Sequence, residues 1–108
     1  MQIFPCPYLK AEVELTDERE AHIANAHPDL VPEFFEQIRQ TLAEPDQVRR
    51  STRSTAARLF YRQFDNVRQG KYIAIVVVSE VTPKERHWII TAYITRRLAN
   101  GEVEWQKN

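Results

Sequence analysis

The hydrophobic periodicity of the chain changes once, close to Asp46, and this change restricts the folds open to it. Before Asp46, apolar residues recur at helical spacing, and prolines such as Pro28 and Pro45 interrupt them. After Asp46, apolar and polar residues alternate with a period of two, which is typical of strands. We therefore expect an α+β fold in which two N-terminal helices, in about residues 16–44, pack on a roughly four-stranded antiparallel sheet in about residues 47–106.

The helical half contains clear start and stop signals. Thr16 or Asp17 provides an N-cap, acidic residues fill the first turn, where the helix dipole favours them, and Pro28 ends a helix expected over 17–27. A second helix is expected over about 32–43, since proline suits a first helical turn. Its buried stripe is expected to consist of Phe34, Phe35, Ile38 and Leu42.

The second half is expected to form an antiparallel meander. The segment 71–79 is apolar at both parities, which is typical of a central strand covered on both faces. A short extended segment at 11–15 precedes the first helix. The meander strands are expected at 47–51, 57–64, 71–79, 87–95 and 102–106.

Length and cysteine usage exclude several classes of protein. The 108 residues suffice for one domain with its own core, and we expect a single domain over 1–108. Cys6 has no second cysteine with which to form a disulfide, and no pattern typical of a signal peptide precedes it. The longest apolar run, 72–78, is far shorter than the roughly 20 residues of a membrane helix. We therefore expect a cytoplasmic protein with no membrane partner.

The formal net charge of zero conceals a separation of charge along the chain. Residues 1–46 carry three basic and ten acidic side chains, a net charge of −7. Residues 47–97 carry eleven basic and three acidic side chains, a net charge of +8. Such a separation is typical of a molecule with one positive face that binds a polyanion. The two halves can also neutralise each other by packing together, and both interpretations stay open.

Strand alternation predicts which side chains share a face. Arg58, Phe60 and Arg62 have one parity in the segment 57–64, and we expect them on an open face near Thr91 and Tyr93. There the arginines would bind phosphate, and Phe60 between them would stack on a base. The same face of 87–95 is expected to carry His87, Ile89, Thr91, Tyr93 and Thr95, and the core face Trp88, Ile90, Ala92 and Ile94. An ordinary solvated sheet face explains this pattern equally well.

Two histidines of the first helix are candidates for proton transfer. His22 follows Glu18 by four residues on the same helix face, where the carboxylate can orient the imidazole or keep it protonated. His27 lies beside Pro28 at the helix end, where the dipole favours a protonated ring and a free carbonyl can accept a hydrogen bond from it. A plain surface role for His22, and a capping or packing role for His27, are the simpler alternatives.

Other chemistries find little support. Gly70 and Gly101 stand alone, so there is no glycine-rich phosphate loop, and no Cys/His spacing matches a zinc site. Cys6 has no activating neighbour. We expect neither a metal nor another cofactor. The remaining imidazole, guanidinium and hydroxyl groups suit RNA cleavage in which the 2′-hydroxyl attacks the adjacent phosphate, while the protein supplies a base, an acid and cations.

Several segments also resemble a known group of proteins. The strongest is LTDEREAHIANAHPDL at 15–30, and the others are LAEPDQV at 42–48, LFYR at 59–62, YIAIVVV at 72–78 and IITAYIT at 89–95. This pattern is similar to that of small prophage and mobile-element proteins of the BECR superfamily, which contains barnase, EndoU, colicin-type tRNases and RelE-like toxins. The neutral net charge departs from the strongly basic character of many such toxins.

The resemblance implies two N-terminal helices, a four-stranded antiparallel sheet and ribonuclease activity without a metal, with a helix histidine acting beside basic and hydroxyl residues of the sheet. On this chain the catalytic positions would be His22, His27, Arg58, Arg62, Thr91 and Tyr93. The residues expected to contact nucleic acid are Arg58, Phe60, Tyr61, Arg62 and His87.

Three functions remain open from the sequence. The leading hypothesis is a toxin-like endoribonuclease that acts on RNA and has an antitoxin or immunity protein as a partner. In it, His22 is the base or acid, His27 the second candidate, and Arg58 and Arg62 clamp the phosphate. The second is a non-catalytic module of the same fold that binds nucleic acid or an acidic partner. The third is an interaction protein whose charged halves pair between subunits, as in a homodimer.

Overall fold

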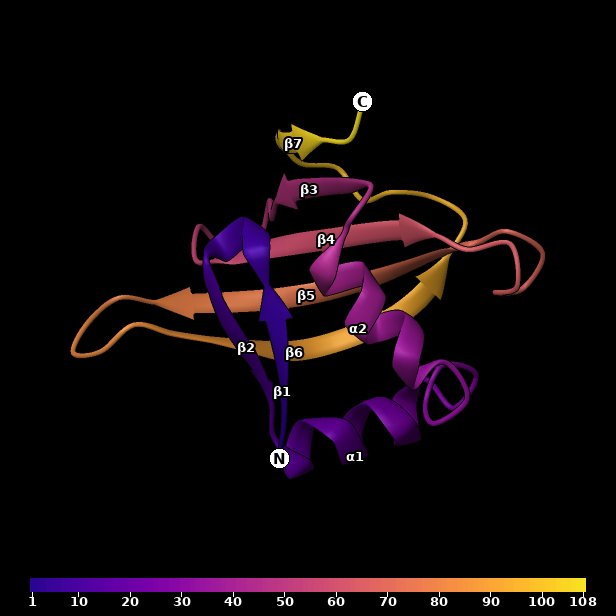
Figure 1. The fold of residues 1–108 in the computed structure, drawn as a ribbon, viewed down its shortest axis with the longest axis horizontal. Helices are drawn as coiled ribbons and strands as arrows, with labels where there is room; N and C mark the ends of the chain where they lie inside the picture. The colour runs from indigo at the N-terminus through magenta and orange to yellow at the C-terminus, as the bar shows by residue number, and fades with distance from the viewer.

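The chain forms a seven-stranded mixed sheet with two α-helices in the computed structural model, which describes residues 1–108 (Figure 1). The strands are β1 (Gln2–Cys6), β2 (Ala11–Leu15), β3 (Gln47–Arg50), β4 (Ala57–Gln63), β5 (Tyr72–Glu80), β6 (Arg86–Thr95) and β7 (Val103–Gln106). The helices are α1 (Asp17–Ala26), α2 (Phe35–Ala43) and the short 3-10 helix η1 (Pro7–Leu9). The strand order is β1-β2-β6-β5-β4-β3-β7, and every neighbouring pair is antiparallel except β2 and β6.

The expectation of a roughly four-stranded antiparallel sheet is wrong, although the α+β class is compatible with the structure. Strands β3 to β6 form the expected meander. The β1–β2 hairpin adds two strands and joins β6 in parallel, where Glu14 pairs with Trp88. Strand β7 leaves the meander and pairs with β3 instead of β6. Pro5 conceals β1 in the sequence, and an edge strand tolerates it because its outer N–H groups need no partner.

The two helices begin in different ways. The Oγ1 of Thr16 accepts a hydrogen bond from the backbone N–H of Arg19 at 3.2 Å, so Thr16 is the N-cap of α1. Helix α2 begins at Phe35, later than expected, because residues 28–34 form turns. Neither helix has the length and apolar character needed to cross a membrane.

The core lies between the sheet and α2, and the sheet curls so that the β1–β2 hairpin crosses on the same side as the helices (Figure 1). The ring of Phe4 on β1 lies 5.7 Å from that of Phe35 on α2. From α2, Ile38 and Leu42 are fully buried. The sheet contributes Val48, Phe60, Ile73, Ile75, Val77, Ile89 and Ala92 to this core.

The opposite sheet face, here called the open face, carries a second, smaller apolar cluster. Leu59, Tyr61 and Ala74 are its buried members. Residues 96–101, here called the strap, follow β6 and are pinned to this face at Ala99. The N–H of Ala99 donates to the Oη of Tyr61 at 3.0 Å, and its carbonyl accepts from Nη1 of Arg49 at 2.5 Å. The strap therefore covers part of the open face and leaves the rest accessible.

The phase of β4 and β6 differs from the expected one. Phe60 pairs with Ile75 of the core, so Arg58 and Arg62 point to the helix-covered face. In β6, Val76 pairs with Thr91 and Val77 with Ile89, so Ile90 is an extra residue in a bulge. The bulge puts Ile89 on the core side and leaves Trp88, Thr91 and Tyr93 on the open side. The arginines and the hydroxyl row therefore lie on opposite faces.

Candidate nucleic-acid interface

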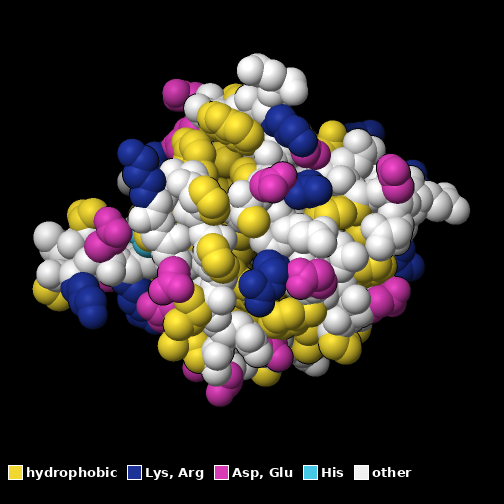
Figure 2. Space-filling model, viewed as in Figure 1, with side chains coloured by type: hydrophobic (Ala, Val, Ile, Leu, Met, Phe, Trp, Pro, Cys, Tyr) yellow, Lys and Arg dark blue, Asp and Glu magenta, His cyan; other side chains and the backbone are white.

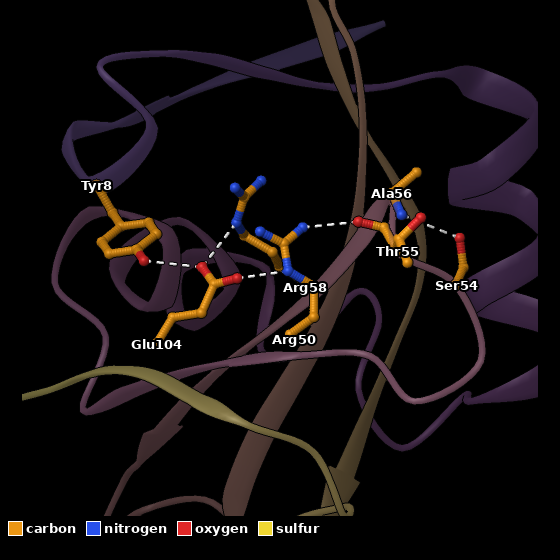
Figure 3. A network of polar contacts seen from close by, with 7 residues as sticks. All are labelled: Tyr8, Arg50, Ser54, Thr55, Ala56, Arg58 and Glu104. Carbon is orange, nitrogen blue, oxygen red and sulfur yellow. Dashed lines mark hydrogen bonds and ion pairs between the residues drawn. The ribbon is translucent and has the colours of Figure 1, made fainter.

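Arg58 belongs to a polar network that joins β4 to β7 (Figure 3). Its Nε donates to Oε1 of Glu104 at 2.9 Å, and the Oη of Tyr8 donates to the same oxygen at 2.9 Å. Arg50 forms an ion pair with the other carboxylate oxygen. Partial burial by itself raises the pKa of Glu104, but the hydrogen bonds from Arg58 and Tyr8 and the two arginine charges lower it below its ordinary value. Arg58 thus neutralises a carboxylate, and its expected place on the open face is wrong.

Arg62 and Phe60 also lie on the helix-covered face of the sheet. Nη1 of Arg62 donates to the carbonyls of Glu44 at 3.1 Å and Gln40 at 3.4 Å, at the C-terminal end of α2. A cation there satisfies free carbonyls and is favoured by the helix dipole. Phe60 is fully buried and meets the ring of Tyr8 edge-on at 5.9 Å. Neither residue shares a face with Thr91, and no contact in the structure supports their predicted roles.

Tyr61 and His87 are buried as well. Tyr61 lies beneath the strap, and burial raises the pKa of its phenol, which keeps it neutral. His87 is 8% exposed, and its Nδ1 lies 2.6 Å from the Oγ of Ser79. Both side chains are closed to a nucleic acid in this conformation, so their predicted contacts with RNA have no geometric support.

The two helix histidines have different surroundings. His22 is exposed on α1 and makes no hydrogen bond or ion pair with its side chain. His27 is the C-cap of α1, its backbone N–H donates to the carbonyl of Ile23 at 2.7 Å, and it is half-buried. The ring of His27 lies against that of Tyr93 on β6, with 5.9 Å between the centroids. The structure therefore brings His27, and not His22, to the hydroxyl row of β6.

A hollow of about 410 Å³ opens beside this row on the open face, and it is here called the open-face hollow. Its floor includes Leu59 and Val76 of the central strands. Its polar lining consists of Ser51, Thr52, Arg53, Ser54, Thr91, Tyr93 and Asn100. The β3–β4 loop, the strap and β6 therefore meet around one concavity, and each contributes polar side chains.

The electrostatics of this hollow suit an anionic ligand. Arg53 is its one charged lining residue, is exposed and forms no ion pair. No Asp or Glu lines the hollow. On the opposite, helix-covered face, Lys and Arg side chains alternate with Asp and Glu instead of forming one basic patch (Figure 2). An unpaired guanidinium beside hydroxyl and amide donors is a suitable arrangement for a phosphate group.

Of the predicted catalytic residues, the structure brings together His27, Thr91 and Tyr93. Arg53 and Asn100, which also line the hollow, are not among the site residues predicted from the sequence. The serine- and arginine-rich run RRSTRS at 49–54 carried a usable signal, because a basic loop beside a β-strand edge can approach a polyanion. Nothing local in the sequence shows that this loop and the strap enclose the same hollow.

No family model, no curated protein and no solved structure matches this chain. The resemblance to the BECR superfamily therefore stays a prediction, and the geometry of the open-face hollow must support any function on its own.

Proposed function

We propose that this protein is a metal-independent endoribonuclease whose active site is the open-face hollow. The observation that carries the proposal is the contact of His27 with Tyr93, which sets an imidazole beside a hydroxyl-lined, carboxylate-free concavity. Two elements distant in the sequence, the end of α1 and β6, supply these two groups. They are the residue types that RNA cleavage through the 2′-hydroxyl requires.

In the proposed reaction, His27 removes the proton of the 2′-hydroxyl, whose oxygen then bonds to the adjacent phosphorus. The bond from phosphorus to the 5′-oxygen breaks, and the phenol of Tyr93 protonates the leaving oxygen. The products are a 2′,3′-cyclic phosphate and a 5′-hydroxyl, and a proton returned from His27 to Tyr93 restores both groups. Arg53 stabilises the charge that develops on the phosphate oxygens, and Thr91 positions the phosphate.

Two further features support this proposal. The basic segment of the chain, residues 47–97, supplies most of the lining of the hollow. The segments at 15–30 and 89–95, which resemble the BECR superfamily, are those that bring His27 and Tyr93. The reaction assigned here uses the same chemistry that the resemblance implies, on a revised set of residues.

A second candidate function is RNA binding without cleavage. It is favoured by the position of His22, Arg58 and Arg62, because three of the six predicted catalytic groups lie away from the hollow. In that case Arg53 and the aromatic and hydroxyl groups bind single-stranded RNA through phosphate contacts and stacking. Binding would weaken as the salt concentration rises.

The two functions are separated by incubating the purified protein with mixed-sequence RNA in EDTA, and with DNA of the same sequence. Cleavage of RNA to cyclic-phosphate ends, with intact DNA, supports the ribonuclease, since DNA lacks the attacking hydroxyl. Salt-sensitive binding of both strands with neither cut supports the binding module. Absence of binding to either nucleic acid overturns both.

A further inference from the structure

A second polar site lies at the far end of β6, where the β1–β2 hairpin meets the β5–β6 hairpin. His87 is its buried member: its side chain is 9% exposed, and its Nδ1 lies 2.6 Å from the Oγ of Ser79. The other ring nitrogen, Nε2, is buried and has no hydrogen-bond partner. A buried polar atom left without a partner is uncommon and requires an explanation.

His87 borders a hollow of about 220 Å³, whose lining also contains acidic residues from two elements. Glu12 and Glu14 of β2, Glu85 before β6 and the apolar side chain of Ile3 line it. Glu14 is already paired, because Arg86 contacts its Oε1 at 3.2 Å and stacks on Trp88. Glu12 and Glu85 have no Lys or Arg partner. Two carboxylates that line the hollow, those of Glu12 and Glu85, are therefore not neutralised by a basic side chain of the protein.

A second hollow of about 250 Å³ adjoins the first and shares Glu14, Glu85 and Arg86 with it. It adds Glu80, which forms no ion pair, and Lys84 at the hairpin tip. Across the two hollows, four carboxylates face two basic side chains, and one of the two, Arg86, is held by Glu14. The excess of acidic side chains thus extends across both hollows.

We propose that these two hollows bind an alkylammonium ligand, and that a polyamine is the ligand they fit. No three acidic, histidine or cysteine side chains come close enough to hold a metal ion, so the carboxylates suit a larger cation with several separated charges. One ammonium group donates to Glu85 and to the free Nε2 of His87, and others reach Glu12 in the first hollow and Glu80 in the second. The methylene chain lies against Ile3, which is 45% exposed.

The proposal assigns the proton of His87 to Nδ1, which donates to Ser79, so that Nε2 keeps a lone pair for the ligand. Glu85 lies 3.6 Å from Nε2, beyond hydrogen-bond distance, and is 61% exposed. Its carboxylate can therefore turn to bind the same ammonium group as the imidazole. The site shares no residue with the open-face hollow, so its test is independent of the ribonuclease proposal.

The test is a titration of the ¹⁵N-labelled protein with spermidine, followed through the ring nitrogens of His87. We expect saturable binding, a lone pair on Nε2 in the free protein and a shift of that nitrogen on binding. Glu12→Gln and Glu85→Gln should each weaken binding by about tenfold, as the loss of one charge-assisted hydrogen bond predicts. Glu33→Gln, at an exposed carboxylate outside both hollows, is the matched control and should leave affinity unchanged.

Two further arms separate the possible ligands. Magnesium alone should not compete with spermidine, and competition would indicate mere charge screening and overturn the site. N-acetyl-lysine methylamide carries one ammonium group and should bind at least about tenfold more weakly, because it cannot reach the second hollow. Equal affinity for both would assign the site to a lysine side chain of a protein instead of a polyamine. A proton on Nε2 of free His87, or equal effects of all three glutamine variants, overturns the proposal.

Discussion

Arg58 of β4 and Glu104 of β7 are joined by a hydrogen bond of 2.9 Å across 46 positions of the chain. Because β7 is short and lies at the sheet edge, this bond and that of Tyr8 hold it to the body of the protein. Replacing Glu104 by Gln removes the charge that Arg50 and Arg58 neutralise. We expect a loss of about 2 kcal/mol in the free energy of unfolding, because hydrogen bonds to charged groups are the stronger ones. Urea denaturation measures it.

The matched control for Glu104 is its exposed neighbour in the strap-to-β7 connection, Glu102, whose side chain forms no ion pair. Glu102→Gln should change stability by less than about 0.5 kcal/mol, as for most exposed sites. Equal effects of the two substitutions would show that the network contributes nothing to stability.

The lowered pKa of Glu104 also predicts a pH dependence of stability. A carboxyl whose pKa is depressed by folding contributes stability in full above its unfolded pKa, about 4.3 for Glu, and loses it as the pH falls through the lower, folded value. The stability difference between the wild type and Glu104→Gln should therefore shrink between neutral pH and about pH 3. Denaturation curves at the two pH values measure it, and a constant difference would contradict the shift.

Substitution of His27 tests the proposed active site against the simpler expectation from the sequence. His27→Gln should lower the rate of RNA cleavage by about 10² to 10⁴, the usual range for the loss of a general base. His22→Gln should leave the rate within about twofold, because His22 is exposed and its side chain forms no hydrogen bond or ion pair. Initial rates and circular dichroism spectra of both variants distinguish catalysis from misfolding. A larger loss of rate for His22→Gln than for His27→Gln would indicate that His22, and not His27, is the catalytic histidine.

Arg53 is expected to bind phosphate, so Arg53→Gln should weaken the binding of single-stranded RNA several-fold. Loss of one phosphate contact should lower the slope of log affinity against log salt by about 0.7. Arg68→Gln is the control, because Arg68 is exposed in the turn between β4 and β5 and forms no ion pair. Fluorescence anisotropy at several salt concentrations gives both slopes, and identical behaviour of the two variants would exclude Arg53 from the interface.

The backbone of Arg50 lies close to Gly101, where the strap ends. A Cβ built there collides with the backbone carbonyl oxygen of Arg50. We expect Gly101→Ala to cost about 2–3 kcal/mol, in the range of overpacking with a backbone shift, and to release β7 from β3. At Gly70, a Cβ meets only the side chain of Gln63 at 3.6 Å, and φ of +87° adds strain of about 1 kcal/mol. Thermal unfolding should rank Gly101→Ala as the more harmful, and a reversed order would contradict the contact.

The sequence by itself determined the elements whose signals are local. The N-cap at Thr16 and the proline at position 28 define α1, and alternation identifies β3 to β6. These signals involve residues within a few positions of each other, so they act whatever the rest of the chain does. Strand β1 pairs with the adjacent strand β2, but Pro5 conceals it in the sequence. The pairing of β7 with β3 joins segments that are far apart in the chain, so no local pattern indicated it.

Only the tertiary structure decided which face of the sheet is covered. Both faces of β4 carry apolar residues, with Phe60 on one face and Leu59 and Tyr61 on the other. Alternation therefore shows which residues share a face, but it does not show which face packs against α2. In β6 the bulge at Ile90 reverses the parity halfway along the strand. The helices bury Phe60 on one face of the sheet, and the strap buries Tyr61 on the other. Thr91, Tyr93 and Arg53 are left around the accessible hollow.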